Sequence, residues 1–322
     1  MGAMRAPVPD LRRVRKVPVA LVMFNRPDCT RRVFERIAEY RPEKLLLAAD
    51  GPRTEDERAL CDEVRAVERL VDWDCEVLTN YSDTNLGMKR REISAFDWVF
   101  EQCEEAIVLE DDTLPARSFF PYCADLLERF RDDDRVMMIG GDNYIVDGTT
   151  PPYSYFFSKY PGTWGWAGWR RAWQVYDETM AEWPAVRETS WVEDTIGGAA
   201  SSEQWRTWFD DTYAGRISTW DYQWTFGMWR RNGFCISPAR NLIRNIGFGK
   251  RATNTQARSR MARLGAAELD FPLRHPPIVE WSPELDRKLF AGERRLAAEP
   301  LPRRMLRRGL GLGLRRVKET RL

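Results

Sequence analysis

An apolar run that leads straight into three carboxylates is the segment of this sequence with the clearest chemical potential. Residues 106–109 read AIVL, and Glu110, Asp111 and Asp112 follow directly. Such a run is typical of a strand buried on both faces of a parallel sheet, and open α/β sheets hold ligands at the carboxyl ends of their strands. Carboxylates this close repel one another unless a cation or hydrogen-bond donors neutralise them.

Two interpretations of these acids follow. A hard divalent ion, Mn²⁺ or Mg²⁺, would neutralise them and would keep open positions for phosphate oxygens. Alternatively, they form a solvated acidic turn that caps the next helix. The position at the end of a buried strand favours the metal site.

The composition argues against several other chemistries. The 322 residues include 50 basic and 49 acidic side chains, and this near-neutral balance argues against nucleic-acid binding. The single histidine, His275, makes histidine-based zinc or triad chemistry a poor fit. The six cysteines show neither metal-site spacing nor a disulfide framework, so we expect a reducing, cytoplasmic setting. No segment approaches the length of a transmembrane helix.

Strand and helix signals alternate through the first half of the chain. The expected strands are 17–24, 44–49, 74–78, 106–109 and 135–139, and the expected helices between them are 28–40, 54–70, 85–101 and 115–130. This alternation predicts an α/β fold with a mainly parallel sheet and helices on both faces. Polar residues would then meet at one edge of the sheet as a composite site. Neither a GxGxxG motif nor a glycine-rich phosphate loop is present, so dinucleotide-binding and P-loop folds lose their main support.

The second half is rich in tryptophan and glycine. The run GTWGWAGWRRAW at 162–173 predicts a turn and then a helix to about residue 180. Trp166, Trp169 and Trp173 would share one face of that helix, which is the pattern of core residues. Trp164 is flanked by small residues that suit a turn. Its indole there either stacks on a sugar ring or merely packs, and the sequence leaves both open.

Asp221 is the candidate general base. It lies in the aromatic run TWDYQW, whose desolvating side chains would raise its basicity. A carboxylate in such a setting could take a proton from an acceptor hydroxyl. An acid at the expected start of a helix also has a plain role beside the helix dipole. The neighbouring Trp220, together with Trp164, is the predicted contact for the acceptor.

Several motifs together resemble a known family. The run VLEDDTLPARSFF, preceded far upstream by FNRP, resembles the nucleotide-sugar glycosyltransferases of the GT-A fold. It is most similar to the N-acetylglucosaminyltransferase family that initiates complex N-glycan branching, which carries Glu-Asp-Asp where most GT-A enzymes carry Asp-x-Asp. The runs GTWGWAGWRRAW, TWDYQW and NIGFG also resemble bacterial glycosyltransferase-like proteins of the same superfamily.

The resemblance covers roughly residues 17 to 256 and implies an organisation of the chain. It implies a nucleotide-sugar-binding half at 17–145 and an acceptor and catalytic half of the same domain at 146–256, followed by a C-terminal extension at 257–322. The implied activity is a metal-dependent, inverting transfer from a nucleoside-diphosphate sugar to an acceptor hydroxyl in glycan, glycolipid or natural-product synthesis. A UDP-sugar is the first choice of donor.

The resemblance also implies roles for individual residues. In the resemblance, Asp112 would bind the metal directly, and Asp111 and Glu110 would contact the ribose and the metal's water shell. Arg26 would contact the nucleotide and its phosphates, and Asp50 would accept a hydrogen bond from the base. Asp221 would be the general base. Lys89, Arg90 and Arg91 either point at the diphosphate or form a solvated helix face.

One position departs from the bacterial relatives. They are expected to carry a histidine a few residues after the NIGFG run, where this chain has Asn254. Asparagine is a poorer metal ligand, which puts metal affinity and activity in doubt.

The C-terminal residues 302–322 are rich in arginine and leucine. They suit either an interfacial helix on anionic lipid, at the inner face of a membrane, or a disordered basic tail. Three glycines within this segment weaken the helix interpretation.

Two other function classes remain as alternatives. A nucleotidyltransferase that makes nucleotide-sugars uses a similar sheet and metal, but its glycine-rich, lysine-containing loop after the first strand is absent, since FNRPD stands at 24–28. A non-catalytic carbohydrate-binding protein on a decayed transferase fold is the other alternative, and Asn254 is its only support.

Overall fold

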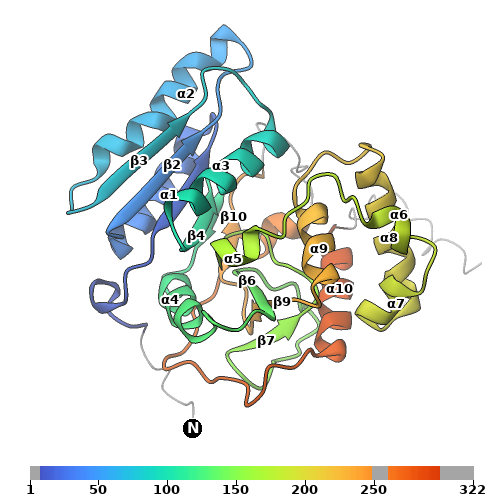
Figure 1. The fold of residues 1–322 in the computed structure, drawn as a ribbon. Helices are drawn as coiled ribbons and strands as arrows, with labels where there is room; N and C mark the ends of the chain where they lie inside the picture. The colour runs from blue at the N-terminus through green and yellow to red at the C-terminus, as the bar shows by residue number, and fades with distance from the viewer. Residues whose placement is uncertain (1–7, 249–259, 298–322) are drawn as a thin grey trace, which may run out of the picture.

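A mixed eight-stranded sheet with helices on both faces forms the centre of the molecule (Figure 1). The computed structural model describes residues 8–248 and 260–297. In order across the sheet, the strands are β3 (Glu76–Tyr81), β2 (Lys44–Ala49), β1 (Val19–Met23), β4 (Glu105–Glu110), β8 (Trp166–Trp169), β6 (Val136–Gly140), β9 (Phe234–Pro238) and β7 (Tyr155–Ser158). Only β8 and β7 run against the common strand direction. The predicted α/β class with a mainly parallel sheet is therefore confirmed.

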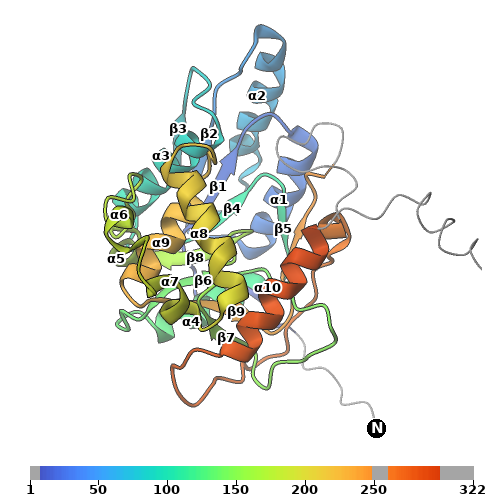
Figure 2. The ribbon, with the colours of Figure 1, turned by 90° about the vertical axis from the view of Figure 1, so that its right-hand side faces the viewer.

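Helices cover the sheet on its two sides (Figures 1 and 2). On one side pack α1 (Pro27–Tyr40), α2 (Arg58–Arg65) and α4 (Phe119–Arg129), and on the other α3 (Met88–Gln102), α8 (Ala199–Tyr213), α9 (Asp221–Arg230) and α10 (Pro283–Ala297). The shorter helices are α5 (Arg170–Trp173), α6 (Trp183–Val186) and α7 (Trp191–Ile196), and the 3₁₀ turns are η1 (Leu11–Arg13), η2 (Glu55–Glu57), η3 (Ala66–Leu70) and η4 (Arg260–Arg263).

The side chains of β1 explain why the sheet is buried on both faces. Val19, Leu21 and Met23 belong to the core beneath α1 and α4, whereas Ala20 and Val22 belong to the core beneath α3 and α9. Successive strand residues point to opposite faces, so an uninterrupted apolar run can only be satisfied between two helical layers.

Strand pairing brings the polar strand ends together. Strand β1 pairs in parallel with both β2 and β4, with Met23 opposite Ala49 and Val22 opposite Glu110. The chain therefore leaves all three strands at the same edge of the sheet. Strand β8 runs antiparallel to β4, with Trp166 opposite Val108, so the residues before Trp166 arrive at this edge as well.

A small second sheet closes over the same edge. Strand β5 (Thr113–Pro115) pairs antiparallel with β10 (Ile243–Asn245). The predicted helix at 115–130 is therefore wrong at its start, since α4 begins only at Phe119. The backbone of β5 forms hydrogen bonds with β10, and the sequence around β5 does not reveal this distant partner.

The tryptophan-rich segment also differs from expectation. Residues Trp166–Trp169 form a strand, and only Arg170–Trp173 is helical. Trp166 and Trp169 consequently lie in the cores on opposite faces of the sheet, not on one face of a helix. The expectation that Trp166, Trp169 and Trp173 are core residues is confirmed, since all three are buried. Strand β8 forms here because it fills the position between β4 and β6.

Helix α10 is fastened to the sheet through one buried carboxylate. Asp286 accepts hydrogen bonds from the Ser158 hydroxyl at 2.5 Å, the Lys159 backbone N–H at 2.8 Å and the Trp281 indole N–H at 2.6 Å. The predicted C-terminal extension thus packs against β7 where it is described. Asn254 and the basic segment 302–322 lie outside the described residues. Within 8–248 and 260–297, no helix is long and apolar enough to cross a membrane.

We expect Asp286→Ala to lower the free energy of unfolding by about 2–4 kcal/mol, because three donors lose their acceptor in a buried setting. Denaturant unfolding followed by tryptophan fluorescence measures this change. Glu284→Ala is the matched control, since Glu284 lies exposed on the same helix. Equal stability of the two variants would show that Asp286 does not fasten α10.

Candidate active site

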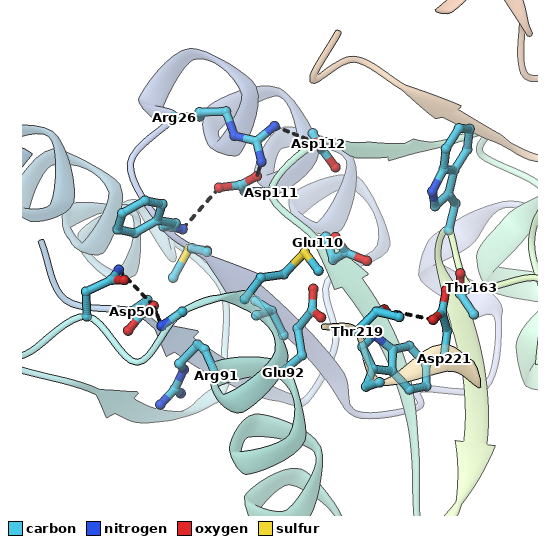
Figure 3. Close-up of a pocket in the computed structure, with 18 of the residues that line it drawn as sticks. Arg26, Asp50, Arg91, Glu92, Glu110, Asp111, Asp112, Thr163, Thr219 and Asp221 are labelled. Carbon is cyan, nitrogen blue, oxygen red and sulfur yellow. Dashed lines mark hydrogen bonds and ion pairs between the residues drawn. The ribbon is translucent and has the colours of Figure 1, made fainter. Parts of the chain in front are cut away.

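A cavity of about 370 Å³ lies at the edge of the sheet where the parallel strands end (Figure 3). The predicted site residues that line it are Arg26, Asp50, Glu110, Asp111, Asp112, Trp164, Trp220 and Asp221. Lys89 and Arg90 are predicted site residues that do not line it. The structure thus brings together residues from the ends of β1, β2 and β4, the turn before β8 and the start of α9.

Arg26 partly neutralises the acids that follow β4. Its Nη1 lies 2.5 Å from Asp112 Oδ2, and its Nη2 lies 3.5 Å from Asp111 Oδ1. The Phe24 backbone N–H donates to Asp111 Oδ2 at 3.0 Å. No described residue donates to Asp112 Oδ1, although this atom is buried. Within residues 8–248 and 260–297, Asp112 therefore has one acceptor atom without a donor.

Glu92 is a further acid of the site, and the sequence analysis missed it. It projects from α3 to a position beside Glu110 in the middle of the cavity, and its buried Oε2 accepts no hydrogen bond from the described residues (Figure 3). The sequence pattern could have indicated this buried acid, because Glu92 falls on the same face of the helix as the core residues Phe96 and Val99. A glutamate on such a stripe indicates a special environment.

The site has more negative charge than its arginines compensate. Burial, and next the neighbouring carboxylates, raises the pKa of Glu92 and of Glu110 above its ordinary value. Burial also raises the pKa of Asp111, against the opposing effect of Arg26. Each carboxyl would ionise more readily if a cation lay among them.

The donor set of the site fits a hard divalent ion. Carboxylate oxygens are the ligands that Mn²⁺ and Mg²⁺ prefer. Within the described residues, no three His, Cys, Asp or Glu side chains are grouped closely enough to hold a metal by themselves. An ion of the Mg²⁺ type needs only one or two protein carboxylates and completes its shell with water and phosphate oxygens, and Asp112 with a neighbouring acid would supply these.

Asp50 has a structural task in this cavity. Its Oδ1 accepts hydrogen bonds from the backbone N–H groups of Gly51 and Leu86, at 2.9 and 2.8 Å. Its Oδ2 accepts from Asn85 Nδ2 at 3.0 Å and from the Gly87 N–H at 3.1 Å. A carboxylate has about four lone-pair sites, and here all are used. Asp50 thus fixes the loop before α3 and offers a nucleobase no free acceptor.

The three cations at the start of α3 separate from one another. Lys89 forms an ion pair with Glu178 at 3.1 Å, and Arg90 is exposed. Arg91 lines the cavity but donates to the side chain and backbone of Asn80. Of these three side chains, only Arg91 lines the cavity, and its guanidinium points away from the acids that follow β4 (Figure 3).

Arg53 also lines the cavity, and the sequence analysis missed it. Its guanidinium lies 5.1 Å from the centre of the Phe24 ring and forms an ion pair with Glu57.

Asp221 is the first residue of α9 and faces the cavity from the side opposite Arg26 (Figure 3). Its Oδ1 accepts hydrogen bonds from the Thr219 hydroxyl at 2.7 Å and the Tyr222 N–H at 2.9 Å. Burial raises the pKa of Asp221 above its ordinary value. The carboxylate thus does contact the start of the helix, and it is also a stronger base than a solvated aspartate.

The two predicted acceptor contacts differ in exposure. Trp220 is buried, with its ring centre 4.8 Å from that of Phe96, so it forms part of the cavity floor. Trp164 is half-buried and makes edge contacts with Tyr144 and Phe248. Its indole is therefore the more accessible of the two.

The NIGFG run owes its pattern to close packing against Asp112. The Ile246 N–H donates to the Asp112 carbonyl at 2.8 Å, and the Gly247 N–H donates to Asn245 Oδ1 at 2.9 Å. A side chain at Gly247 would overlap Asp112 Oδ2 and Arg26 Nη1. This glycine is therefore a site residue, which only the tertiary structure reveals.

Comparisons with known proteins give no family assignment. No family model matches the chain, and no curated protein matches it. Solved structures match at low similarity. One is the mannosyltransferase PcManGT from Pyrobaculum calidifontis in complex with GDP-Man and Mn²⁺, at 12% identity and a TM-score of 0.33. The match covers 52% of this chain and 48% of the mannosyltransferase, so it spans about half the length of that protein.

Two further structures have similar scores. Mouse xyloside xylosyltransferase 1 in its apo form is 12% identical, with 66% of this chain and 81% of that chain covered and a TM-score of 0.32. The 4-diphosphocytidyl-2C-methyl-D-erythritol synthase from Anaerococcus prevotii is 11% identical, with 61% and 84% covered and a TM-score of 0.29.

Proposed function

We propose that this protein is a metal-dependent glycosyltransferase that moves a sugar from a nucleoside-diphosphate sugar to an acceptor hydroxyl. The observation that carries the proposal is a single cavity with two different kinds of chemical group on its two sides. Buried acids with an unused Asp112 oxygen lie on one side, and the basic carboxylate of Asp221 lies on the other. The volume of about 370 Å³ falls in the range of small-molecule sites. The GT-A resemblance of the EDD segment supports the same assignment.

On the donor side, Asp112 would hold a divalent ion, with Asp111 and Glu110 beside it. When bound, the ion supplies positive charge that stabilises the leaving diphosphate. Arg26 orients Asp112 through its ion pair and lines the cavity, where its remaining donors can reach a phosphate. Glu92 lies between these groups and Asp221, where a hydroxyl of the transferred sugar could donate to its unused oxygen.

On the acceptor side, Asp221 would act as general base. Its carboxylate takes the proton of the acceptor hydroxyl while that oxygen forms a bond to the anomeric carbon. The bond from this carbon to the diphosphate oxygen breaks, and the nucleoside diphosphate leaves. A single displacement of this kind inverts the configuration at the anomeric carbon.

Thermal unfolding with UDP, GDP, CDP, dTDP and ADP, each with and without Mn²⁺, tests the donor site. We expect one diphosphate, UDP first, to stabilise the protein only together with Mn²⁺. A ligand at about a hundred times its dissociation constant adds about 2.7 kcal/mol. Asp112→Asn should lose this response, whereas Asp56→Asn, an exposed acid, should keep it. No response to any diphosphate would refute the donor site.

Gly247→Ala should weaken Mn²⁺-dependent UDP binding by about tenfold, which is about 1.4 kcal/mol. The added methyl group displaces the Asp112–Arg26 pair, and because the displaced atoms are side-chain ends the fold should persist. Titration calorimetry measures the affinity. Gly265→Ala is the control, since a side chain there meets no atom within 4 Å. Unchanged affinity in Gly247→Ala would exclude the pair from the donor site.

Asp221→Asn should keep donor binding and lower transfer by about a hundredfold or more, because the amide cannot accept the proton. Release of nucleoside diphosphate measures turnover. Activity of the unsubstituted protein should fall as the pH drops through the raised pKa of Asp221, which is higher than that of an ordinary aspartate. Normal turnover in Asp221→Asn would remove this residue from the mechanism. Release of pyrophosphate instead would indicate a nucleotidyltransferase.

A further inference from the structure

A second, smaller hollow opens on the far side of Asp221. It measures about 80 Å³ and shares Thr163 and Asp221 with the larger cavity. Helix α10 contributes Glu293 and α8 contributes Trp205 to its wall. A group bound here would lie next to Asp221, on the side away from Arg26 and Asp112.

One wall of this hollow carries a buried carboxylate that is only half satisfied. Asp142 is 2% exposed, and its Oδ2 accepts from the Tyr144 hydroxyl at 2.7 Å and the Trp164 N–H at 3.2 Å. Its Oδ1 is buried without a hydrogen-bond partner among the described residues. A side chain at Gly162 would overlap that atom, so the chain keeps this space clear. Among the described residues, no group donates a hydrogen bond to this oxygen.

Glu293 adds a second carboxylate to the same hollow. Burial, then the charges of Asp142 and Asp221, raises the pKa of Glu293 to about 7. Burial raises the pKa of Asp142 to about 6. Arg294 follows Glu293 but is exposed, and no lysine, arginine or histidine in the described chain lines the hollow.

Aromatic side chains form a large part of the remaining wall. The rings of Tyr160 and Trp205 stack with their centres 5.7 Å apart, and the ring centres of Trp208 and Tyr222 are 5.4 Å apart. Aromatic faces attract cations through the ring quadrupole, and together with carboxylates they form a typical site for an ammonium group. Among the described residues, an anion would meet several carboxylates here and no cation.

We propose that this hollow binds the ammonium group of an amine-bearing acceptor, such as an amino sugar, whose neighbouring hydroxyl then lies beside Asp221. The inference rests on the proposed function, because the hollow is an acceptor subsite only if Asp221 is the base. An ammonium has three donors, which suit the free Asp142 oxygen and the carboxylate of Glu293. The small volume suits one group of the acceptor and not an extended oligosaccharide. Anionic acceptors are excluded by charge.

Titration calorimetry on the full chain tests the proposal, in the presence of Mn²⁺ and UDP and again without them. The probes have the same sugar ring and differ in one substituent. They are glucose, glucuronate, and aminodeoxyglucoses with the amine at C2, C3 or C6. The titrations are run at a pH where the amine is protonated. We expect at least one amino sugar to bind about tenfold or more tighter than glucose, and glucuronate to bind more weakly than both.

Two substitutions locate the effect. Glu293→Gln and Asp142→Asn keep the side-chain shape and remove one carboxylate each, so we expect both variants to fold, which unfolding curves verify. Each should reduce the preference for the amino sugar over glucose to about threefold or less, because an amide no longer attracts the ammonium. Glu203→Gln is the control, since it removes an exposed charge from α8 outside the hollow.

The outcomes separate this inference from the proposed function. Equal binding of glucose and all amino sugars, or a preference that survives both substitutions, overturns the ammonium site even when Mn²⁺ and UDP bind. An amino-sugar preference that both substitutions abolish supports the site. If that preference appears while no nucleoside diphosphate binds, the ammonium site stands and the transferase proposal fails.

Discussion

The concentration of buried negative charge where β4 ends is the constraint on which the rest of the site depends. Parallel pairing of β1 with β2 and β4 sends three strand ends to one edge, so acids from separate loops must share a small volume. Arg26 offsets part of the charge. The repulsion among the remaining carboxylates is not compensated by the described side chains. Such uncompensated buried charge occurs mainly at functional sites. Two features hold this edge in place: the loop 85–87 and the pairing of β5 with β10. Gly247, which has no side chain, leaves the space that Asp112 and Arg26 occupy.

The site divides into two chemical environments that meet at Asp221. The side of Arg26 and Asp112 is polar and suits a charged, hydrated ligand with its counter-ion. The side of Tyr160 and Trp205 is aromatic and suits the faces of a ring or an organic cation. Asp221 lines both hollows, so its carboxylate borders both environments.

The sequence predicts the parallel half of the sheet well, because uninterrupted apolar runs followed by polar residues have few other interpretations. It also predicts the acids after β4 and the position of Asp221. It fails at β8 and β5, whose strand character depends on partners that lie far away in the chain. Gly247 could not be predicted from its neighbours, because its constraint is the space beside Asp112. For Asp50, the sequence indicates a residue of the site but not its hydrogen-bond partners. Its lone pairs accept from loop donors whose positions only the tertiary structure gives.

The closing of the site by the β10 segment has a consequence for how the protein is made. The Cys29 thiol contacts the Ile246 carbonyl across 217 residues of sequence, so the two sides of the acidic edge come from segments far apart in the chain. Contacts of such long range form late, because chain closure must precede them. A chain still emerging from the ribosome therefore has its acids exposed to water without a finished site. Any ligand that needs both sides of this edge would therefore bind only to the completed domain, and would favour correctly folded molecules.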